Sequence, residues 1–237
     1  MRHNSDARSN AGEYVAAPEI AADVTGNELS RGVRDRLRTL SKATAESVSR
    51  HLVMVDRLLY EDPDLAYEHA RAAAGSGSRV DVVREALGLA AYAKGSYGEA
   101  LRELRTARRL SGGAGLVSVM ADCERGLGRP ERAIALVEET DVRQLDRAEI
   151  IELGIVVAGA RLDLDQPEAA LAYLDRLRPG TDVERGRVAS IRADVLEVLE
   201  RAEEAARMRA LAQKLLADDE FVQPADNFIT DLADGDL

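Results

Sequence analysis

The feature that most constrains this chain is a pair of apolar stripes separated by a short turn, between Val80 and Gly113. The stripes recur at helical spacing, first at Val83, Leu87, Ala90 and Ala91, then at Ala100, Leu101, Leu104, Ala107 and Leu110. Gly95 suits the positive φ of a helix end, and Ser96 can cap the helix that follows. Two helices this short cannot bury their apolar faces alone, so the pattern predicts neighbours of the same shape.

The same pattern recurs along the chain. Alanine stands early in the second helix of each unit, at Ala66, Ala100, Ala133, Ala170 and Ala205, with spacings of 34, 33, 37 and 35 residues. Proline precedes three of these alanines, at Pro63, Pro130 and Pro167, where the first helical position loses nothing by the missing N–H. We interpret the alanines as points where two helices cross too closely for a larger side chain.

A period of 34 residues in helix–turn–helix units is the signature of tetratricopeptide repeats. Residues 81–114 resemble this family at its own spacings, through Gly88, Ala91, Gly95, Tyr97, Ala100, Leu104 and Ala107. The resemblance extends more weakly over residues 47–219, where the family's frequent Trp and the Pro that ends its second helix are missing. The chain is also similar to Ala/Arg-rich bacterial tetratricopeptide proteins of unassigned function. The resemblance implies an all-α, right-handed solenoid of five helix pairs that binds proteins.

We therefore predict four regions. Residues 1–27 are expected to be disordered, residues 28–46 to form a basic capping helix, and residues 218–237 to form an acidic, largely disordered tail. The solenoid is expected to occupy residues 47–217, in units at about 47–80, 81–113, 114–150, 151–185 and 186–217.

The composition agrees with closely packed helices in a cytoplasmic protein. The chain is 46% hydrophobic but only 3% aromatic, and no apolar run approaches the roughly 20 residues of a membrane span. The N-terminal residues lack the apolar core of a signal peptide. Cys123 is the single cysteine, so no internal disulfide is possible and a reducing compartment is expected.

Charge is distributed unevenly. The tail has seven acids and no base, so it carries −7 of the net −11 and leaves −4 for residues 1–217. Nucleic acid and membrane surfaces are disfavoured as partners, because both need a basic stripe. Residues 31–42 hold five bases and one acid, which indicates either a docking strip or, as we favour, a cap with a solvated outer face.

No constellation for catalysis is present, so we predict no enzymatic activity, no cofactor and no metal. His3, His51 and His69 have no second ligand at helical spacing, and no Gly-rich segment carries the Lys-Ser/Thr of a nucleotide loop. The acidic neighbours of Cys123 are expected to raise its thiol pKa, which makes a structural thiol the better interpretation.

Function is therefore expected on the surface. If the units stack as in the family, first-helix side chains line a concave groove, and the predicted partner-binding set is His51, Val55, Glu85, Leu89, Tyr92, Ser118, Asp122, Arg125, Ile155, Ser190, Asp194 and Glu197. These residue types favour a peptide or protein with apolar anchors and some basic residues. The sequence indicates neither the identity of that partner nor an oligomeric state.

Three further hypotheses concern particular segments. Phe228, Ile229 and Leu232 have helical spacing in the tail, which is either a solubilising end or a docking motif. An alternative to the scaffold is a self-regulated sensor whose tail binds its own basic helix or groove, and a less favoured one is an RNA-binding repeat protein. Glu124 and Arg161 stand on usually apolar positions of adjacent units, so we expect them to pair.

Overall fold

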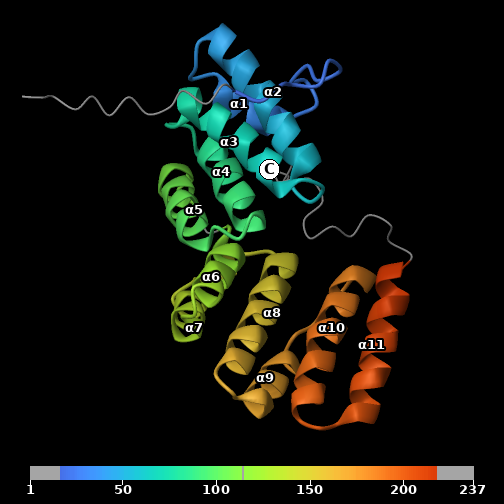
Figure 1. Cartoon of the computed structure of the whole chain (residues 1–237). Helices are drawn as coiled ribbons and strands as arrows, with labels where there is room; N and C mark the ends of the chain where they lie inside the picture. The colour runs from blue at the N-terminus through green and yellow to red at the C-terminus, as the bar shows by residue number, and fades with distance from the viewer. Residues whose placement is uncertain (1–16, 114, 218–237) are drawn as a thin grey trace, which may run out of the picture.

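The computed structural model describes residues 17–113 and 115–217. Within these ranges the chain is all-α, with eleven α-helices, one 3₁₀ helix at Val142–Gln144 and no strand (Figure 1). The α-helices are α1 (Arg31–Leu37), α2 (Lys42–Leu58), α3 (Pro63–Gly77), α4 (Asp81–Ala93), α5 (Tyr97–Ser111), α6 (Val117–Gly126), α7 (Pro130–Glu138), α8 (Arg147–Asp163), α9 (Pro167–Leu174), α10 (Asp182–Val198) and α11 (Ala202–Ala217).

Packing follows the order of the chain. Helix α2 packs on α3, α4 on α5, α6 on α7, α8 on α9 and α10 on α11, and every one of these helices also contacts its next neighbour in the sequence. Contacts that skip one helix join α2 to α4, α4 to α6, α6 to α8 and α8 to α10. Figure 1 accordingly shows the helices following one another from α1 and α2 at one end to α10 and α11 at the other.

The five alanines that define the repeat are buried, as the sequence predicts. Ala66, Ala100, Ala133 and Ala170 have no exposed surface and Ala205 is 1% exposed. Gly88 marks another close approach, because a Cβ at this position would lie 2.7 Å from the side chain of Leu104 on α5. Small residues therefore stand where α4 meets α5 and early in every second helix.

Four of the turns between consecutive helices share one backbone conformation. The residue five places before the repeat alanine has a positive φ, at Gly95, Gly128, Asp165 and Glu200. The next N–H donates to the carbonyl five residues earlier, over 2.8 Å from Ser96 to Ala91 and 2.9 Å in the other three turns. This is the hydrogen bond of a Schellman helix end. It recurs although Asp165 and Glu200 lack the conformational freedom of glycine.

The turn between α2 and α3 is built differently. Asp62 accepts a hydrogen bond of 3.0 Å from the N–H of Leu65, and Pro63 occupies the first position of α3. The side chain of Asp62 thus binds one of the first N–H groups of α3, which have no carbonyl partner within the helix. Pro63 takes the first helical position, as the sequence predicts.

Two expectations about the ends of elements are wrong. Residues 17–27 do not behave as a disordered segment: Val24 is 2% exposed, its carbonyl accepts a 3.0 Å hydrogen bond from Arg50, and Asp23 pairs with Arg57 at 2.8 Å. Val24 joins the main apolar core, against which Ile20 and Ala21 also pack, although this short segment has no extended periodic stripe. Leu110, at the C-terminal end of α5, is 45% exposed although it continues the apolar stripe of that helix.

Residues 1–16 and 218–237 lie outside the described part of the chain, and with them the predicted tail motif Phe228, Ile229 and Leu232. Among the described helices, none combines the length and the hydropathy needed to cross a lipid bilayer.

Candidate functional site

Four polar side chains from three helices form one continuous row. The hydroxyl of Tyr92 on α4 donates to Asp122 on α6 over 2.6 Å, and Arg125 donates to the other oxygen of Asp122 over 2.7 Å. Arg125 then reaches α8, where its Nε and one terminal nitrogen lie 2.8 and 3.3 Å from the two oxygens of Asp163. We call Tyr92, Asp122, Arg125 and Asp163 the charged row.

Helix geometry places these groups together. Asp122 and Arg125 are three residues apart on α6 and so share a face. The guanidinium of Arg125 lies against α8 at Gly159, where a Cβ would stand 2.6 Å from the Arg125 Cζ atom. A larger residue at position 159 would push this side chain away from Asp163. Gly159 is therefore part of what positions the charged row.

The charges in the row stabilise one another while remaining in contact with solvent. The side chains of Asp122, Arg125 and Asp163 are 25%, 26% and 38% exposed. Burial opposes the charged form of Arg125, but hydrogen bonds and charges from Asp163 and Asp122 raise the pKa of its guanidinium above the ordinary value. Burial, and then the bond to Asp122, raise the pKa of the Tyr92 hydroxyl far above its usual range, so Tyr92 stays a donor.

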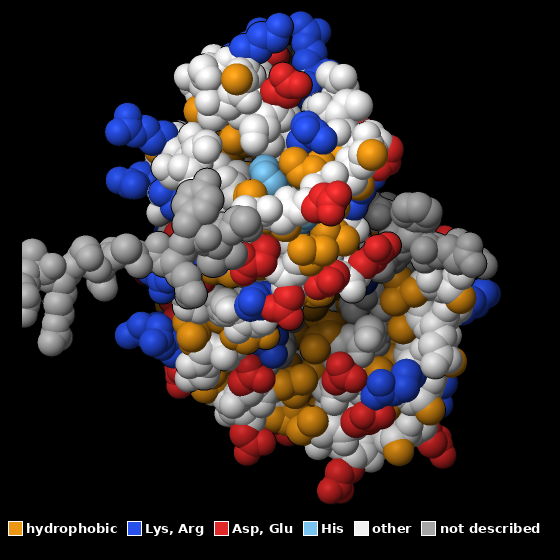
Figure 2. All heavy atoms as spheres, turned by 45° about the horizontal axis from the view of Figure 1, so that its top comes forward, with side chains coloured by type: hydrophobic (Ala, Val, Ile, Leu, Met, Phe, Trp, Pro, Cys, Tyr) orange, Lys and Arg blue, Asp and Glu red, His pale blue; other side chains and the backbone are white. Residues whose placement is uncertain are grey.

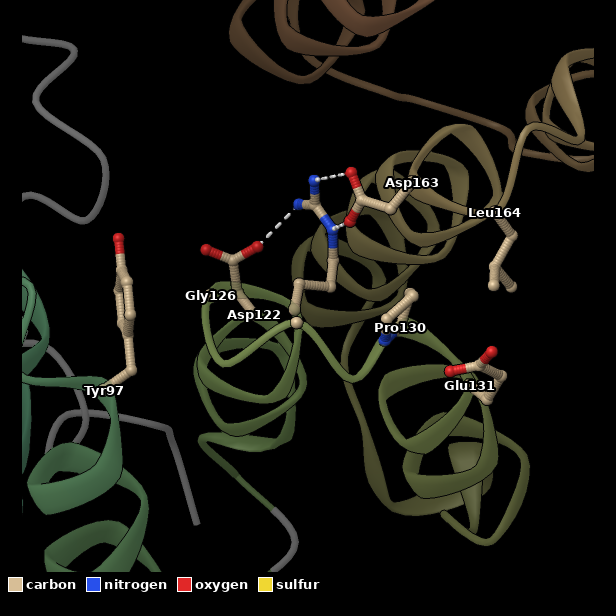
Figure 3. Close-up of a pocket in the computed structure, with 9 residues that line it drawn as sticks. Tyr97, Asp122, Gly126, Pro130, Glu131, Asp163 and Leu164 are labelled. Carbon is tan, nitrogen blue, oxygen red and sulfur yellow. Dashed lines mark hydrogen bonds and ion pairs between the residues drawn. The ribbon is translucent and has the colours of Figure 1, made fainter.

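The row borders an open cleft of about 530 Å³ (Figure 3). The cleft is lined by Tyr97, Asp122, Arg125, Gly126, Gly128, Pro130, Glu131, Asp163 and Leu164. Arg125 binds both Asp122 and Asp163, and Figure 3 shows Tyr97 on the side of Asp122 that is away from Asp163. Three carboxylates line the cleft against one guanidinium, so a ligand would meet an acidic surface.

A second polar group is buried between α2 and α3. The Nδ1 atoms of His51 and His69 lie 2.9 Å apart, and the two rings are 6% and 0% exposed. The Nε2 atom of His69 is buried and has no hydrogen-bond partner. Burial lowers the pKa of His69 to about 4, and it lowers the pKa of His51 as well.

Glu85 on α4 is a third unusual group. One of its carboxylate oxygens is buried without a hydrogen-bond partner, and burial raises its pKa to about 7 against the opposing charge of Arg36. The carboxyl therefore takes up a proton near neutral pH. We treat it as a titrating core group rather than as a fixed negative charge on a groove.

The structure brings together only part of the predicted groove set. Tyr92, Asp122 and Arg125 belong to the charged row, while Asp194 and Glu197 both bind Arg209, at 3.3 and 2.6 Å. Ser118 and Ile155 are half-buried, and Ser190 is exposed.

Three predicted positions need correction. His51, Val55 and Leu89 are 6%, 0% and 4% exposed, so they belong to the core and offer a partner almost no surface. The family's groove positions assume that each first helix leaves this face open. Here the side chains around α2 and α4 close over it, and these residues lie in or against one continuous apolar core.

The sequence analysis missed Tyr97, Glu131, Gly159 and Asp163 as parts of one site. Asp163 follows Arg125 by 38 residues, close to one repeat, so a search for opposite charges one repeat apart would have paired them. Gly159 is not in the predicted partner-binding set. Nothing in its local sequence indicates that an arginine from another helix lies against it.

The predicted pair of Glu124 and Arg161 is wrong. Glu124 is 3% exposed and binds Arg105 at 2.9 Å and Arg129 at 3.5 Å, whereas Arg161 donates to Gln166. A buried carboxylate needs a partner, as argued from the sequence. The arginines of α5 and of the following turn lie closer to it than the arginine of the next unit.

The described residues include no group of three or more His, Cys, Asp or Glu side chains that could hold a metal ion. Cys123 is fully buried, and burial together with the charges of Asp122 and Glu124 raises its thiol pKa to about 12. No known protein family matches this chain, and no curated protein matches its sequence.

Proposed function

We propose that this chain is a tetratricopeptide-like solenoid of five helix pairs that serves as a non-enzymatic scaffold for protein partners. The architectural part is supported by the buried repeat alanines and by four turns with the same positive φ and the same hydrogen bond. Packing that follows chain order, with contacts between alternate helices, is also typical of stacked repeats.

The observation that carries the functional part is the charged row beside its open cleft. Side chains from α4, α6 and α8 meet along one face, which is how successive first helices contribute to a shared binding surface. Because Arg125 is already held by two carboxylates, its charge is not available to an anionic ligand. Glu131 is exposed at the cleft and has no such counterion there.

The molecular surface indicates what kind of partner would fit. On the face drawn in Figure 2 there is a hollow with hydrophobic side chains in its floor and Asp and Glu among the side chains at its rim. A peptide or protein segment with apolar anchors and Lys or Arg residues complements such a surface. The buried, unreactive thiol of Cys123 supports a binding role over a nucleophilic one.

The test exploits a repeated turn. Glu131 follows Pro130 in the first turn of α7 and lines the cleft, whereas Glu168 follows Pro167 in the first turn of α9 and lies outside it. Both glutamates are exposed. Glu131→Lys and Glu168→Lys therefore make the same charge change at the same helical position, which equalises the effect on the helix dipole.

Wild type and both variants would be used as bait in nuclease-treated extract of the source cell, and each captured protein would then be titrated against the purified baits. We expect Glu131→Lys to weaken binding at least tenfold while Glu168→Lys binds like wild type, with unchanged circular dichroism for both. Equal binding by all three baits would place the site elsewhere on the molecule. A complex that forms in untreated extract but is lost after nuclease treatment would favour the RNA-binding alternative.

A further inference from the structure

Helix α5 carries a row of three exposed arginines. Arg102, Arg105 and Arg109 are exposed and lie at positions i, i+3 and i+7. Leu110, the residue after Arg109, is 45% exposed and lies at the border of this row. We call these four residues the α5 arginine face. Figure 2 shows Lys and Arg side chains projecting from the left flank of the molecule, the flank on which α5 lies in Figure 1.

The acidic residues of α5 do not neutralise this face, because both are turned towards other helices. Glu99 accepts a hydrogen bond of 2.8 Å from Tyr67 on α3. Glu103 pairs with Arg84 on α4 at 2.6 Å, and its side chain is only 16% exposed. The helix therefore separates its charges, with carboxylates inward and guanidinium groups outward.

The buried carboxylate of Glu124 forms ion pairs with two nearby arginines. Glu124 on α6 lies 2.9 Å from Arg105 and 3.5 Å from Arg129, and those two side chains are 55% and 47% exposed. The pair of guanidinium groups around a single carboxylate leaves a net positive charge at the surface, next to Arg102 and Arg109. An anion can approach all of these groups from solvent.

The arginines of α1, the other basic cluster of the sequence, are a poorer anion site. Arg31 and Arg38 share the exposed carboxylate of Asp35, at 3.8 and 3.0 Å. Arg36 pairs with Asp81 on α4, and Arg34 donates to the carbonyl of Asn27 over 3.0 Å. An incoming acidic segment would have to compete with carboxylates that already stand on this surface.

We propose that the α5 arginine face is the docking surface for the acidic C-terminal segment of the same chain, residues 218–237. That segment carries seven acids and no base, and its Phe228, Ile229 and Leu232 provide apolar side chains for the exposed Leu110. Phe228 and Leu232 lie eleven and fifteen residues beyond Ala217, which gives them a reach of at most about 40 and about 54 Å when extended, comparable with the diameter of a body of this size. Because the segment is tethered, its effective concentration at the face is on the order of millimolar. This inference is independent of the cleft and of its proposed partner.

The experiment uses paramagnetic broadening in the full-length chain. Thr230→Cys places a thiol beside the apolar residues of the segment without changing its charge, and a nitroxide is attached there. Cys123 is fully buried with a raised thiol pKa, so it remains unlabelled, which the wild-type chain checks. We expect amide signals of residues 102–110 to broaden at low salt and to recover at 1 M salt, where the screening length falls to about 3 Å.

Two double variants then locate the contact. Arg102→Ser with Arg109→Ser should abolish the broadening, while the matched change on α1, Arg31→Ser with Arg38→Ser, should leave it intact. Arg105 is kept in both, so that Glu124 retains its partner. No broadening on α5, or broadening on α1 or at the cleft instead, would overturn the proposal.

A mixed sample distinguishes the segment of the same chain from that of a second copy. Isotope-labelled chain without nitroxide is mixed with unlabelled chain that carries it. Docking within one chain predicts no broadening in this mixture, and broadening of residues 102–110 there would show that the segment comes from another molecule, against the proposal.

Discussion

The charged row and the histidine pair are both polar groups between helices, but they differ in how deeply they are buried and in whether they carry charge. The charged row keeps full charges, each paired, in side chains that remain 25–38% exposed. The histidine pair is almost fully buried and carries no charge at neutral pH, because burial lowers both pKa values. Partial solvation lets one group stay ionised, and its absence forces the other to be neutral.

This difference predicts which change, a substitution or a lower pH, should destabilise each group. The charged row depends on its one cation, since Arg125 is the only counterion that joins Asp122 to Asp163. The raised pKa values of Arg125 and Tyr92 mean that both side chains keep their protons in mild acid. The histidine pair depends on remaining unprotonated, so mild acid is what it should not tolerate.

The largest effect is expected from removing the cation. Arg125→Met keeps much of the aliphatic volume but leaves Asp122 and Asp163 without their shared partner on adjacent helices. Because the carboxylates are partly solvated, we expect the free energy of unfolding to fall by about 2–3 kcal/mol, below the range for a fully buried pair. Urea unfolding followed by circular dichroism measures this change.

A surface pair provides the control. Arg143 binds Asp141 at 2.8 Å, but its side chain is 86% exposed. Arg143→Met should change the free energy of unfolding by no more than about 0.5 kcal/mol, as for most exposed ion pairs. If both substitutions cost the same, the row does not hold α6 and α8 together, and the comparison with the histidine pair fails.

Much of the fold could be predicted from sequence because it depends on spacing. The repeat alanines mark helix crossings whatever their neighbours are, and all five are buried. Residues 17–27 could not be predicted in this way, since Val24 joins the core from a segment without a periodic stripe and is fixed there by burial and by a hydrogen bond to its carbonyl. Leu110 follows the stripe but is 45% exposed, which spacing alone does not reveal.

The candidate site was predicted only in part. Tyr92, Asp122 and Arg125 follow from the family's groove positions. Asp163, the last residue of α8, and Glu131, in the first turn of α7, lie outside those positions but line the same cleft. The pairing of Glu124 failed for the same reason, because the choice among several arginines depends on rotamers and on helix crossings. Charge type was predictable from the sequence, whereas the identity of each partner required the structure.

The second prediction separates two opposing responses to acid. His69, with a folded pKa of about 4, binds fewer protons in the folded than in the unfolded chain, so stability is lost as pH falls below about 6.5. Glu85, with a folded pKa of about 7, binds more protons when folded, so stability rises as pH falls from 7 towards 4.5. Between pH 7 and 5 each contribution is about 2 kcal/mol, and in the wild type they largely cancel.

Variants reveal each contribution by removing the other. Glu85→Gln should lose about 2 kcal/mol of unfolding free energy between pH 7 and pH 5, because only the histidine pair still responds. Replacing both His51 and His69 by Leu removes donor and acceptor together, which is close to neutral at pH 7, and should reverse the sign of the pH response. A Glu85→Gln protein equally stable at both pH values would show that the histidines are not held neutral by burial.

The smallest effect is expected at the end of the charged row. Tyr92→Phe removes the 2.6 Å hydrogen bond to Asp122 but leaves Arg125 bound to that carboxylate, so the loss should be about 1 kcal/mol at any pH from 5 to 7. Tyr173→Phe, at a half-buried tyrosine whose hydroxyl has no hydrogen bond to the described residues, should stay within about 0.5 kcal/mol of wild type. If Tyr92→Phe lowers the free energy of unfolding as much as Arg125→Met does, then the packing of α4 depends on the charged row as strongly as that of α6 and α8. A loss no larger than that of Tyr173→Phe would confine the row to the Arg125 contacts, and the binding surface would then be built from two helices rather than three.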